Sequence, residues 1–247
     1  VEQAMTGGAL PTETAVRYSL AASCAYEPAQ RLVSGSTEYL HRLAPSLTYS
    51  AQINVDELAA SASVFEFGEE DGVLVAFRGS TSLRNYQSMF KLGLVPSQLT
   101  PGCDSGRVHR GYQEASLRLY EQLQPVLEKR SPQRTVFVGH SYGGGTSTMC
   151  ALLHSADEVV TFAGPRVGDA AFAAAYNSRL GASTLHLVHK KDPVLAQNQP
   201  LWNSLGYVHT GKLVLCAAEE PMLFSDDENR GLAIPWNFAD HARYLGT

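Results

Sequence analysis

The sequence predicts an α/β fold in which a central, mostly parallel sheet is covered by helices on both faces. Strand and helix patterns alternate along the chain, and residues 73–77 form a continuous apolar run of the kind found in buried strands. No linker, repeat or low-complexity tract interrupts the alternation. A chain of 247 residues can bury one substantial core, so we expect a single domain over residues 1–247.

The N-terminal half is expected to contain a helix, two strands and a second helix. Their predicted ranges are 12–26 for the first helix, 63–67 and 73–77 for the strands, and 111–130 for the second helix. The first helix carries Val16, Leu20 and Cys24 on one apolar stripe. Pro125 should kink or restart the second helix because proline lacks a backbone donor.

The C-terminal half continues the alternation. The predicted ranges are strand 135–138, helix 145–154, strand 158–162, helix 169–180, strands 183–189 and 212–216, and a helix from about Pro235. Residues 93–106 and 217–231 look irregular. Successive β-α-β units favour parallel strand pairing, which agrees with the predicted sheet.

Charge and cysteine content exclude several classes of protein. The net charge is −5 and no cluster of Lys and Arg is present, which argues against a nucleic-acid partner. No apolar stretch reaches the roughly 20 residues of a membrane-spanning helix. The even count of cysteines permits two disulfides, but they lie far apart without a Cys-x-x-Cys pair: Cys24, Cys103, Cys150 and Cys216. We expect Cys150 to be a small buried apolar residue, and we expect no metal, no cofactor and a monomeric chain.

The most informative segment is Gly-His-Ser-Tyr-Gly-Gly at residues 139–144, between a predicted strand and a predicted helix. A serine at a tight strand-to-helix turn adopts a strained backbone that projects its hydroxyl above the sheet, and the glycines let helix and strand pack closely. The start of the helix also offers unpaired N–H groups beside Ser141. The alternative is an ordinary Gly-rich turn with a solvated serine. We predict that Ser141 is a nucleophile.

A serine nucleophile needs a histidine base, and in sheets of this kind the chain order is Ser, then Asp or Glu, then His. His154 follows on the same helix as the serine, and His186 and His189 lie within a predicted strand. His241, which enters the last helix, is therefore the predicted base. His209 is the rival candidate, although a hydrogen-bonded structural histidine near a turn explains it better.

Asp192 is the predicted carboxylate, because it directly follows the strand at 183–189 and Pro193 favours an extended backbone before it. Asp169 is better explained as the N-cap of its helix. The other candidates are a surface pair and a residue adjacent to the predicted base: Asp226, Asp227 and Asp240.

An oxyanion hole would need two donors near the nucleophile. Ser80, in the loop after the strand at 73–77, offers its N–H and its hydroxyl, and Tyr142 offers its N–H. Each such donor is worth on the order of 2.7–4 kcal/mol of barrier. The alternative interpretation of these residues is a Ser/Thr-rich turn that caps a helix, which is compatible with the oxyanion role.

Several motifs in order give the chain a family resemblance. They are Phe77-Arg78-Gly79-Ser80, Leu83-Arg84-Asn85-Tyr86, His109-Arg110-Gly111-Tyr112, residues 139–144, residues 162–169, Asp192-Pro193-Val194 and residues 240–246. From about Ala15 to Gly246 the chain resembles the class 3 lipases, the filamentous-fungal triacylglycerol lipase group that includes feruloyl esterases. The resemblance implies an α/β-hydrolase fold, a triad of Ser141, Asp192 and His241, and an oxyanion hole at Ser80 and Tyr142.

Two positions depart from the family pattern. Family members usually carry Leu where this chain has Tyr142, which would narrow or polarise the acyl pocket. Secreted fungal members also tie the first helix to a C-terminal cysteine, but no cysteine follows Cys216 that Cys24 could use. The chain begins at Val1 without an initiator Met, which favours removal of a leader. We expect a secreted protein, with an intracellular location as the alternative.

The resemblance also places a mobile lid after Ser80, over about residues 81–95. Its predicted apolar residues are Leu83, Tyr86, Met89, Phe90 and Leu94, of which those at 83, 86, 90 and 94 share one helical face. Such a lid would hide an acyl groove in water and contact a lipid interface transiently when open. The alternative is a fixed amphipathic surface helix.

The expected function is therefore carboxylester hydrolysis, with acylglycerol esters cleaved through a Ser-His-Asp acyl-enzyme. A feruloyl or short-chain esterase and a phospholipase A1 are the near alternatives. A lipid-binding module without catalysis is the distant one.

Overall fold

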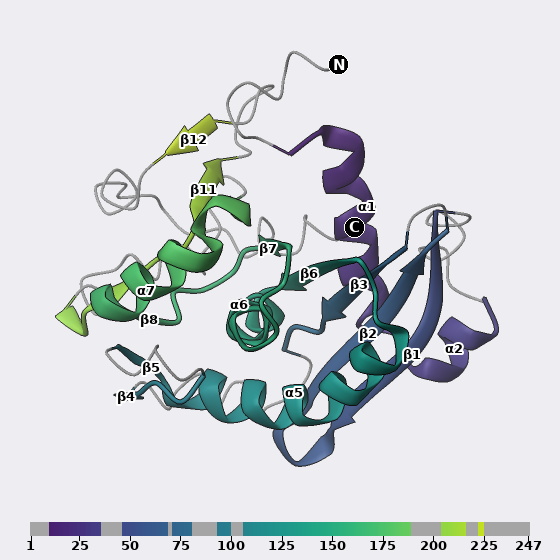
Figure 1. The fold of residues 1–247 in the computed structure, drawn as a ribbon, viewed down its shortest axis with the longest axis horizontal. Helices are drawn as coiled ribbons and strands as arrows, with labels where there is room; N and C mark the ends of the chain where they lie inside the picture. Colours follow the sequence, from purple (N-terminus) through teal and green to yellow (C-terminus); the bar gives the residue numbers. More distant parts are fainter. Residues whose placement is uncertain are drawn as a thin grey trace.

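The structure is a computed structural model, and it describes residues 10–35, 46–68, 71–80, 93–99, 106–188, 204–215 and 222–224. An eight-stranded sheet in the order β1-β2-β3-β6-β7-β9-β11-β12 forms the centre of the fold (Figure 1). Five neighbouring strands pair in parallel: β3 (Gly72–Phe77), β6 (Arg134–His140), β7 (Glu158–Phe162), β9 (Thr184–Val188) and β11 (Lys212–Leu215). The prediction of a mostly parallel central sheet is confirmed.

Antiparallel strands flank the parallel core at both edges. They are β1 (Leu47–Val55) and β2 (Ala60–Phe67) at one edge and β12 (Met222–Phe224) at the other. A second, four-stranded sheet has the order β10-β8-β5-β4, with β10 at Tyr207–Val208, β8 at Gly168–Asp169, β5 at Arg107–His109 and β4 at Leu94–Pro96. The chain passes directly from the central sheet to the second sheet between β7 and β8, which are separated by only a few residues.

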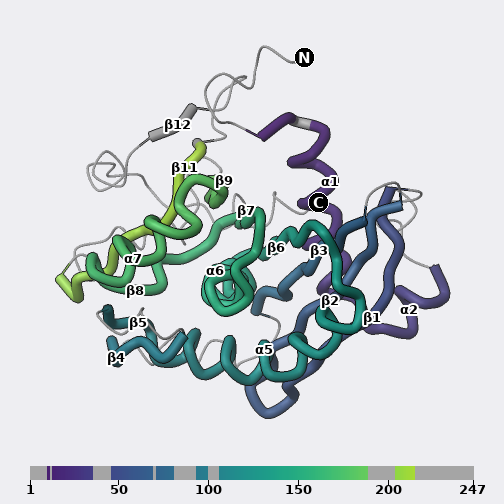
Figure 2. Tube along the Cα trace, in the orientation of Figure 1, coloured from purple at the N-terminus to yellow at the C-terminus, as the bar shows by residue number. Residues whose placement is uncertain are grey.

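Helices cover both faces of the central sheet. α1 (Thr12–Cys24) lies on one face, whereas α5 (Arg110–Arg130), α6 (Tyr142–His154) and α7 (Ala170–Leu180) lie on the other; the short α2 (Ala29–Val33) lies beside β1 (Figure 2). β3 shows why its sequence is a continuous apolar run. Val73, Val75 and Phe77 pack under α5 and α6, and Leu74 and Ala76 pack under α1.

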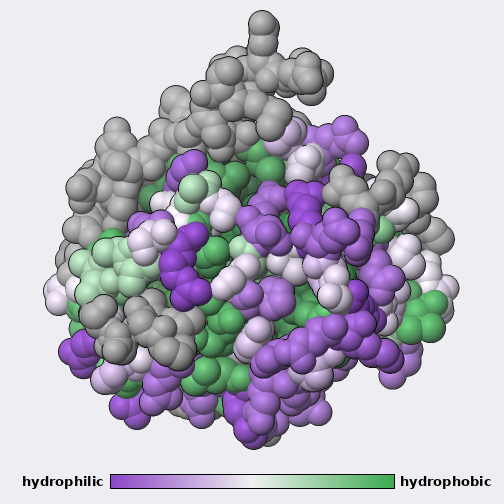
Figure 3. All heavy atoms as spheres, in the orientation of Figure 1, coloured by the Kyte–Doolittle hydropathy of each residue, from purple (hydrophilic) through white to green (hydrophobic). Residues whose placement is uncertain are grey.

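α5 is the amphipathic helix that its sequence predicts. Tyr112, Ala115, Leu119 and Leu123 are buried against the sheet. The polar side of the helix faces outward, and purple side chains cover this part of the face shown in Figure 3. Pro125 neither ends nor restarts the helix, which runs unbroken from Arg110 to Arg130. The helix therefore does not restart at Pro125, because packing of the apolar face on the core compensates for one missing backbone hydrogen bond.

The apolar stripe predicted for α1 was also partly wrong. Leu20 and Cys24 are buried, but Val16 is 44% exposed. Tyr18, Ala21 and Ala22 are buried instead. The helix contacts β6 and β3 through a face rotated toward these residues, and small alanines allow it to approach the strands closely.

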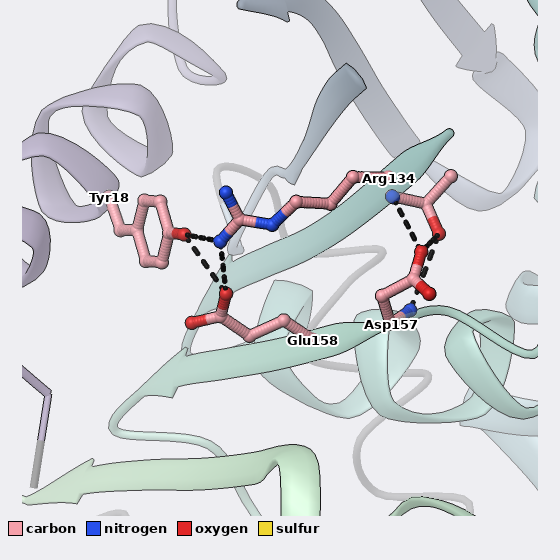
Figure 4. A network of polar contacts seen from close by, with 5 residues as sticks. Tyr18, Arg134, Asp157 and Glu158 are labelled. Carbon is pink, nitrogen blue, oxygen red and sulfur yellow. Dashed lines mark hydrogen bonds and ion pairs between the residues drawn. The ribbon is translucent and has the colours of Figure 1, made fainter. Parts of the chain in front are cut away.

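Polar contacts join the amino ends of β6 and β7 (Figure 4). Ser141 lies at the opposite, carboxyl end of β6. Arg134 Nη2 lies 2.8 Å from Glu158 Oε2, and the Tyr18 hydroxyl donates to the same oxygen at 3.1 Å. Burial and the negative charge of Glu158 raise the pKa of the Tyr18 phenol. The Asp157 carboxylate accepts from the Thr135 N–H at 2.7 Å. These contacts fix the register of the two strands that lead to the candidate site.

No helix in the described ranges combines the length and the apolar character that crossing a membrane requires.

Candidate active site

Ser141 lies at the turn between β6 and α6, where its backbone is strained. Its φ is 55° and its ψ is −123°, a region that glycine adopts readily and that costs other residues about 1–3 kcal/mol. The Ser141 N–H donates to the Phe162 carbonyl at 2.9 Å, and the Ser141 carbonyl accepts from Gly144 at 2.8 Å. Neighbouring backbone therefore holds the serine in this conformation, as the Gly-x-Ser-x-Gly pattern predicts.

The glycines on both sides of the serine permit the sharp turn. A Cβ atom on Gly139 would lie 2.2 Å from the Gly143 carbonyl oxygen, and a Cβ atom on Gly143 would lie 2.1 Å from the Phe77 carbonyl oxygen. Neither contact can be relieved by moving a flexible side chain, because both obstacles are backbone atoms. The helix thus starts directly against the ends of β6 and β3.

α6 begins at Tyr142, three residues earlier than its sequence predicts. Its first turn therefore starts immediately after the serine. The N–H groups of a first turn have no partners within the helix, and they carry the positive end of the helix dipole. This arrangement favours a negative charge that develops beside Ser141.

Ser80 follows the carboxyl end of β3, and Ser141 follows the carboxyl end of the neighbouring strand β6. Phe77 and Gly139 are paired in the parallel ladder between β3 and β6, so the loop after β3 and the turn after β6 emerge side by side. The loop is tied down at Arg78, whose N–H donates to the Ser61 carbonyl at 2.9 Å and whose Nη2 donates to the Ala59 carbonyl at 3.0 Å. Burial lowers the pKa of the Arg78 guanidinium.

The side chain of Tyr142 belongs to the packing between α5 and α6. It is 1% exposed, and its ring centroid lies 5.3 Å from that of Tyr112. Tyr112 in turn lies 4.5 Å from His109, whose Nδ1 caps the start of α5 by accepting from the Gly111 N–H at 3.1 Å. In this chain a tyrosine after the serine thus extends an aromatic row in the core.

Two of the histidines that the sequence sets aside make structural contacts, His154 half-buried and His186 fully buried. His154 stacks on Phe137 with ring centroids 5.5 Å apart, and burial lowers its pKa. His186, in β9, has Nδ1 2.7 Å from the Thr161 hydroxyl. The rival base His209 is 6% exposed, with its ring 5.5 Å from that of His186.

The predicted triad partners Asp192 and His241 lie outside the described residues. β9 ends at Val188, four positions before Asp192, and Phe162 pairs with Leu187 at the carboxyl ends of β7 and β9. The strand before Asp192 thus ends on the same side of the sheet as β6, at the carboxyl ends of the strands where Ser141 lies. Asp169 is the N-cap of α7, where its carboxylate accepts from the Phe172 N–H at 2.9 Å, as predicted.

The predicted lid falls mostly outside the described residues, including Leu83, Tyr86, Met89 and Phe90. Its last part is described and is not helical. Leu94 begins the strand β4, which pairs with β5 and ends at Pro96. The prediction of Leu94 on a helical face was wrong, because pairing with β5 makes this segment a strand. The described part of the stretch 93–106 is irregular as expected, except for the three residues of β4.

Sequence reasoning missed two residues beside the serine. The hydroxyl of Tyr26, just after α1, lies 2.7 Å from Nδ1 of His140, the residue before Ser141. Tyr26 is 114 positions from its partner, so no local pattern indicates the contact.

Cys150 is buried, as expected, and burial raises its pKa, so its thiol stays protonated. Within the described ranges, no cluster of three or more His, Cys, Asp or Glu side chains is arranged to hold a metal ion.

Comparison with known proteins agrees with this architecture. A family model described as lipase (class 3) matches residues 74–200, just over half of the chain's 247 residues. A lipase of Rhizomucor miehei is 32% identical over 165 residues, covering 62% of this chain and 44% of the relative. A secreted mono- and diacylglycerol lipase 1 of Fusarium solani is 30% identical over 146 residues, covering 56% of this chain and 42% of the relative.

The chain spans less than half the length of these two curated relatives. A solved structure of the native Rhizomucor miehei lipase propeptide complex superposes with a TM-score of 0.75 at 23% identity, over 96% of this chain and 82% of the other. The likeness extends over the whole fold, beyond the segment that the family model matches. The chain belongs to the class 3 lipase family and has its α/β-hydrolase fold.

Proposed function

We propose that this chain is a serine carboxylester hydrolase that cleaves acylglycerol esters through an acyl-enzyme. The observation that carries the proposal is the strained backbone of Ser141, with φ 55° and ψ −123°, at the first turn of α6. A strain of about 1–3 kcal/mol persists only where the surrounding structure enforces it, and such positions cluster at functional sites. An ordinary Gly-rich turn would place glycine at this residue.

The proposed reaction begins with attack of the Ser141 hydroxyl oxygen on the ester carbonyl carbon. His241 takes the hydroxyl proton, and Asp192 holds the histidine in the tautomer that can accept it. The negative charge on the carbonyl oxygen is stabilised by the N–H groups of Ser80 and Tyr142. Collapse of the adduct expels the alcohol, which receives its proton from His241, and water then releases the fatty acid by the same sequence of steps.

The substrate class is proposed from the family and from the apolar residues before β4. The matched relatives are a lipase and a mono- and diacylglycerol lipase, which favours glycerides. Leu83, Tyr86 and Phe90 have the spacing of one apolar helical face. We propose that they belong to a lid over the acyl groove that contacts a lipid interface transiently, in a protein that acts as a monomer. The Fusarium solani relative is named as secreted, and we propose the same extracellular location for this chain.

Labelling by a fluorophosphonate, followed by a hydrolysis profile, tests the proposal. The wild-type chain should be labelled once, at Ser141, and should hydrolyse emulsified triglyceride. Ser141→Ala should lose labelling and about 10⁶-fold in kcat while remaining folded. Ser147→Ala is a matched control, since Ser147 lies on the same helix and its hydroxyl only donates to the Gly144 carbonyl at 2.9 Å. It should label and turn over normally.

A folded Ser141→Ala chain with wild-type turnover would exclude the serine as nucleophile. An active chain that prefers phospholipid or a dissolved aromatic ester to triglyceride would move the function to a phospholipase A1 or a soluble-substrate esterase. A folded wild-type chain that binds lipid but neither labels nor hydrolyses any ester would be a lipid-binding module.

A further inference from the structure

The Tyr26 hydroxyl contacts both segments that the proposed oxyanion hole requires. It lies 2.7 Å from Nδ1 of His140, which is 4% exposed and directly precedes Ser141. It also lies against Gly79, where a Cβ atom would be only 1.9 Å from the hydroxyl oxygen and 2.8 Å from the His140 carbonyl oxygen. Gly79 directly precedes Ser80. One oxygen atom therefore touches the turn that carries the nucleophile and the loop that carries the second donor.

The backbone of Tyr26 is itself held firmly. The Tyr26 N–H donates to the Ser23 carbonyl at 3.1 Å and the Glu27 N–H donates to the Cys24 carbonyl at 3.0 Å, which closes the turn after α1. Gln52, in β1, donates its side-chain amide to the Glu27 carbonyl at 2.9 Å and ties the turn to the sheet. A phenol ring has only two side-chain torsions, so its hydroxyl is a well-defined stop for the loop that it contacts.

The loop at residues 78–80 needs such a stop. Arg78 is anchored by hydrogen bonds to β2 and to Ala59, but the chain then leaves the sheet without regular secondary structure. An oxyanion donor works only if it is in place before the charge develops. A displacement of about 1 Å can cost about 100-fold in rate. The groups that hold Gly79, Tyr26 among them, therefore contribute to the position of the Ser80 N–H relative to Ser141.

We infer that Tyr26 is a positioning residue for the oxyanion hole, acting through its hydroxyl on Gly79 and His140. The inference rests on the proposed ester hydrolysis at Ser141. Tyr26 need not touch the substrate: its hydrogen bond to His140 fixes the hydroxyl, and the hydroxyl fixes the distance between the Ser80 loop and the nucleophile turn. The hydrogen bond forms with either ring tautomer, because a phenol both donates and accepts.

Tyr26→Phe removes the hydroxyl and keeps the ring, so it tests the inference directly. We expect kcat on a dissolved p-nitrophenyl ester to fall by about 10- to 100-fold, with KM changed by less than about threefold, because the lost interaction acts on the transition state. Affinity for an alkylboronic acid, which forms a tetrahedral adduct with the serine, should fall in parallel with kcat/KM. Rates are expressed per fluorophosphonate-labelled site, which corrects for any unfolded fraction.

Tyr120→Phe is a matched control. Tyr120 also forms a tyrosine–histidine contact, with its hydroxyl 3.3 Å from Nδ1 of His154, but this contact joins α5 to the far end of α6. It should leave kcat and boronate affinity unchanged. His140→Asn places an amide oxygen or nitrogen near the position of Nδ1 and should retain most activity, whereas His140→Leu should lose as much as Tyr26→Phe. The double variant Tyr26→Phe/His140→Leu should lose little more than either alone.

Wild-type kcat in Tyr26→Phe, or a loss of kcat without a matching loss of boronate affinity, would overturn the inference while leaving the proposed function in place. If Tyr26→Phe does not fold, equal activity of His140→Leu and His140→Asn would also overturn it. A wild-type chain that neither labels nor hydrolyses esters would overturn the proposed function, and this inference with it.

Discussion

Ser141→Gly should make the protein more stable than Ser141→Ala, although both variants lack the hydroxyl. Alanine keeps the strained φ of 55°, whereas glycine adopts it freely. Relief of strain is worth about 1–3 kcal/mol. Glycine costs about 0.5–1 kcal/mol through the greater freedom of the unfolded chain. The net difference in the free energy of unfolding therefore lies between about 0 and 2.5 kcal/mol in favour of glycine, and the middle of this range is about 1 kcal/mol.

For a chain of 247 residues the middle value corresponds to a Tm that is about 2–4 °C higher in Ser141→Gly than in Ser141→Ala. Thermal unfolding followed by circular dichroism, with urea titration as a second measurement, determines it. The control pair is Ser147→Gly and Ser147→Ala, since Ser147 lies inside α6 and glycine there should cost about 1 kcal/mol relative to alanine. Glycine at 141 that is equal to or less stable than alanine would refute the argument that the fold stores strain at this residue.

The remaining predictions concern the base, the lid and the pH dependence. His241→Ala should reduce kcat far more than His209→Ala; the reverse ranking in folded variants would exchange their roles. Replacing Leu83 and Phe90 together with Ser should reduce hydrolysis of emulsified triglyceride much more than hydrolysis of a dissolved short-chain ester, and equal losses would indicate a fixed surface helix. Burial lowers the pKa of His154, so the folded state resists its protonation and the unfolded state binds the proton more readily. Stability should therefore fall as the pH drops below the unfolded pKa of about 6.5 and continue to fall until the lower folded pKa is passed. A urea series between pH 7 and 5 should show a weaker decline in His154→Gln than in wild type, and identical slopes would contradict this assignment.

The strand β7 shows that buried strands are well predicted from the pattern of apolar residues in the sequence. The range 158–162 was predicted to the residue, and β3 and β6 were located within a few residues, because a strand buried on both faces is apolar throughout. β1 was missed altogether. Only Leu47, Ile53 and Val55 of its nine residues are buried, so a partly exposed edge strand lacks that signal.

The unbroken helix at Pro125 and the errors at Val16 and Leu94 share one cause. In each case a local rule was correct as chemistry but was overruled by contacts from distant parts of the chain. α5 continues through Pro125 because the apolar face of the helix is packed on the sheet. Leu94 is a strand residue because β4 pairs with β5. Local propensities amount to fractions of a kcal/mol per residue, which tertiary packing readily exceeds.

By itself the sequence determined the α/β class, the strand-turn-helix context of Ser141 and the N-cap role of Asp169, because each depends on residues adjacent in the chain. Only the tertiary structure decided that Phe77 lies beside Gly139, that Tyr142 packs on Tyr112, and that Tyr26 reaches across 114 positions to His140. Such contacts arise when helices and strands pack, and the free energy that selects them is shared over the whole core. No short pattern of residues can carry that information.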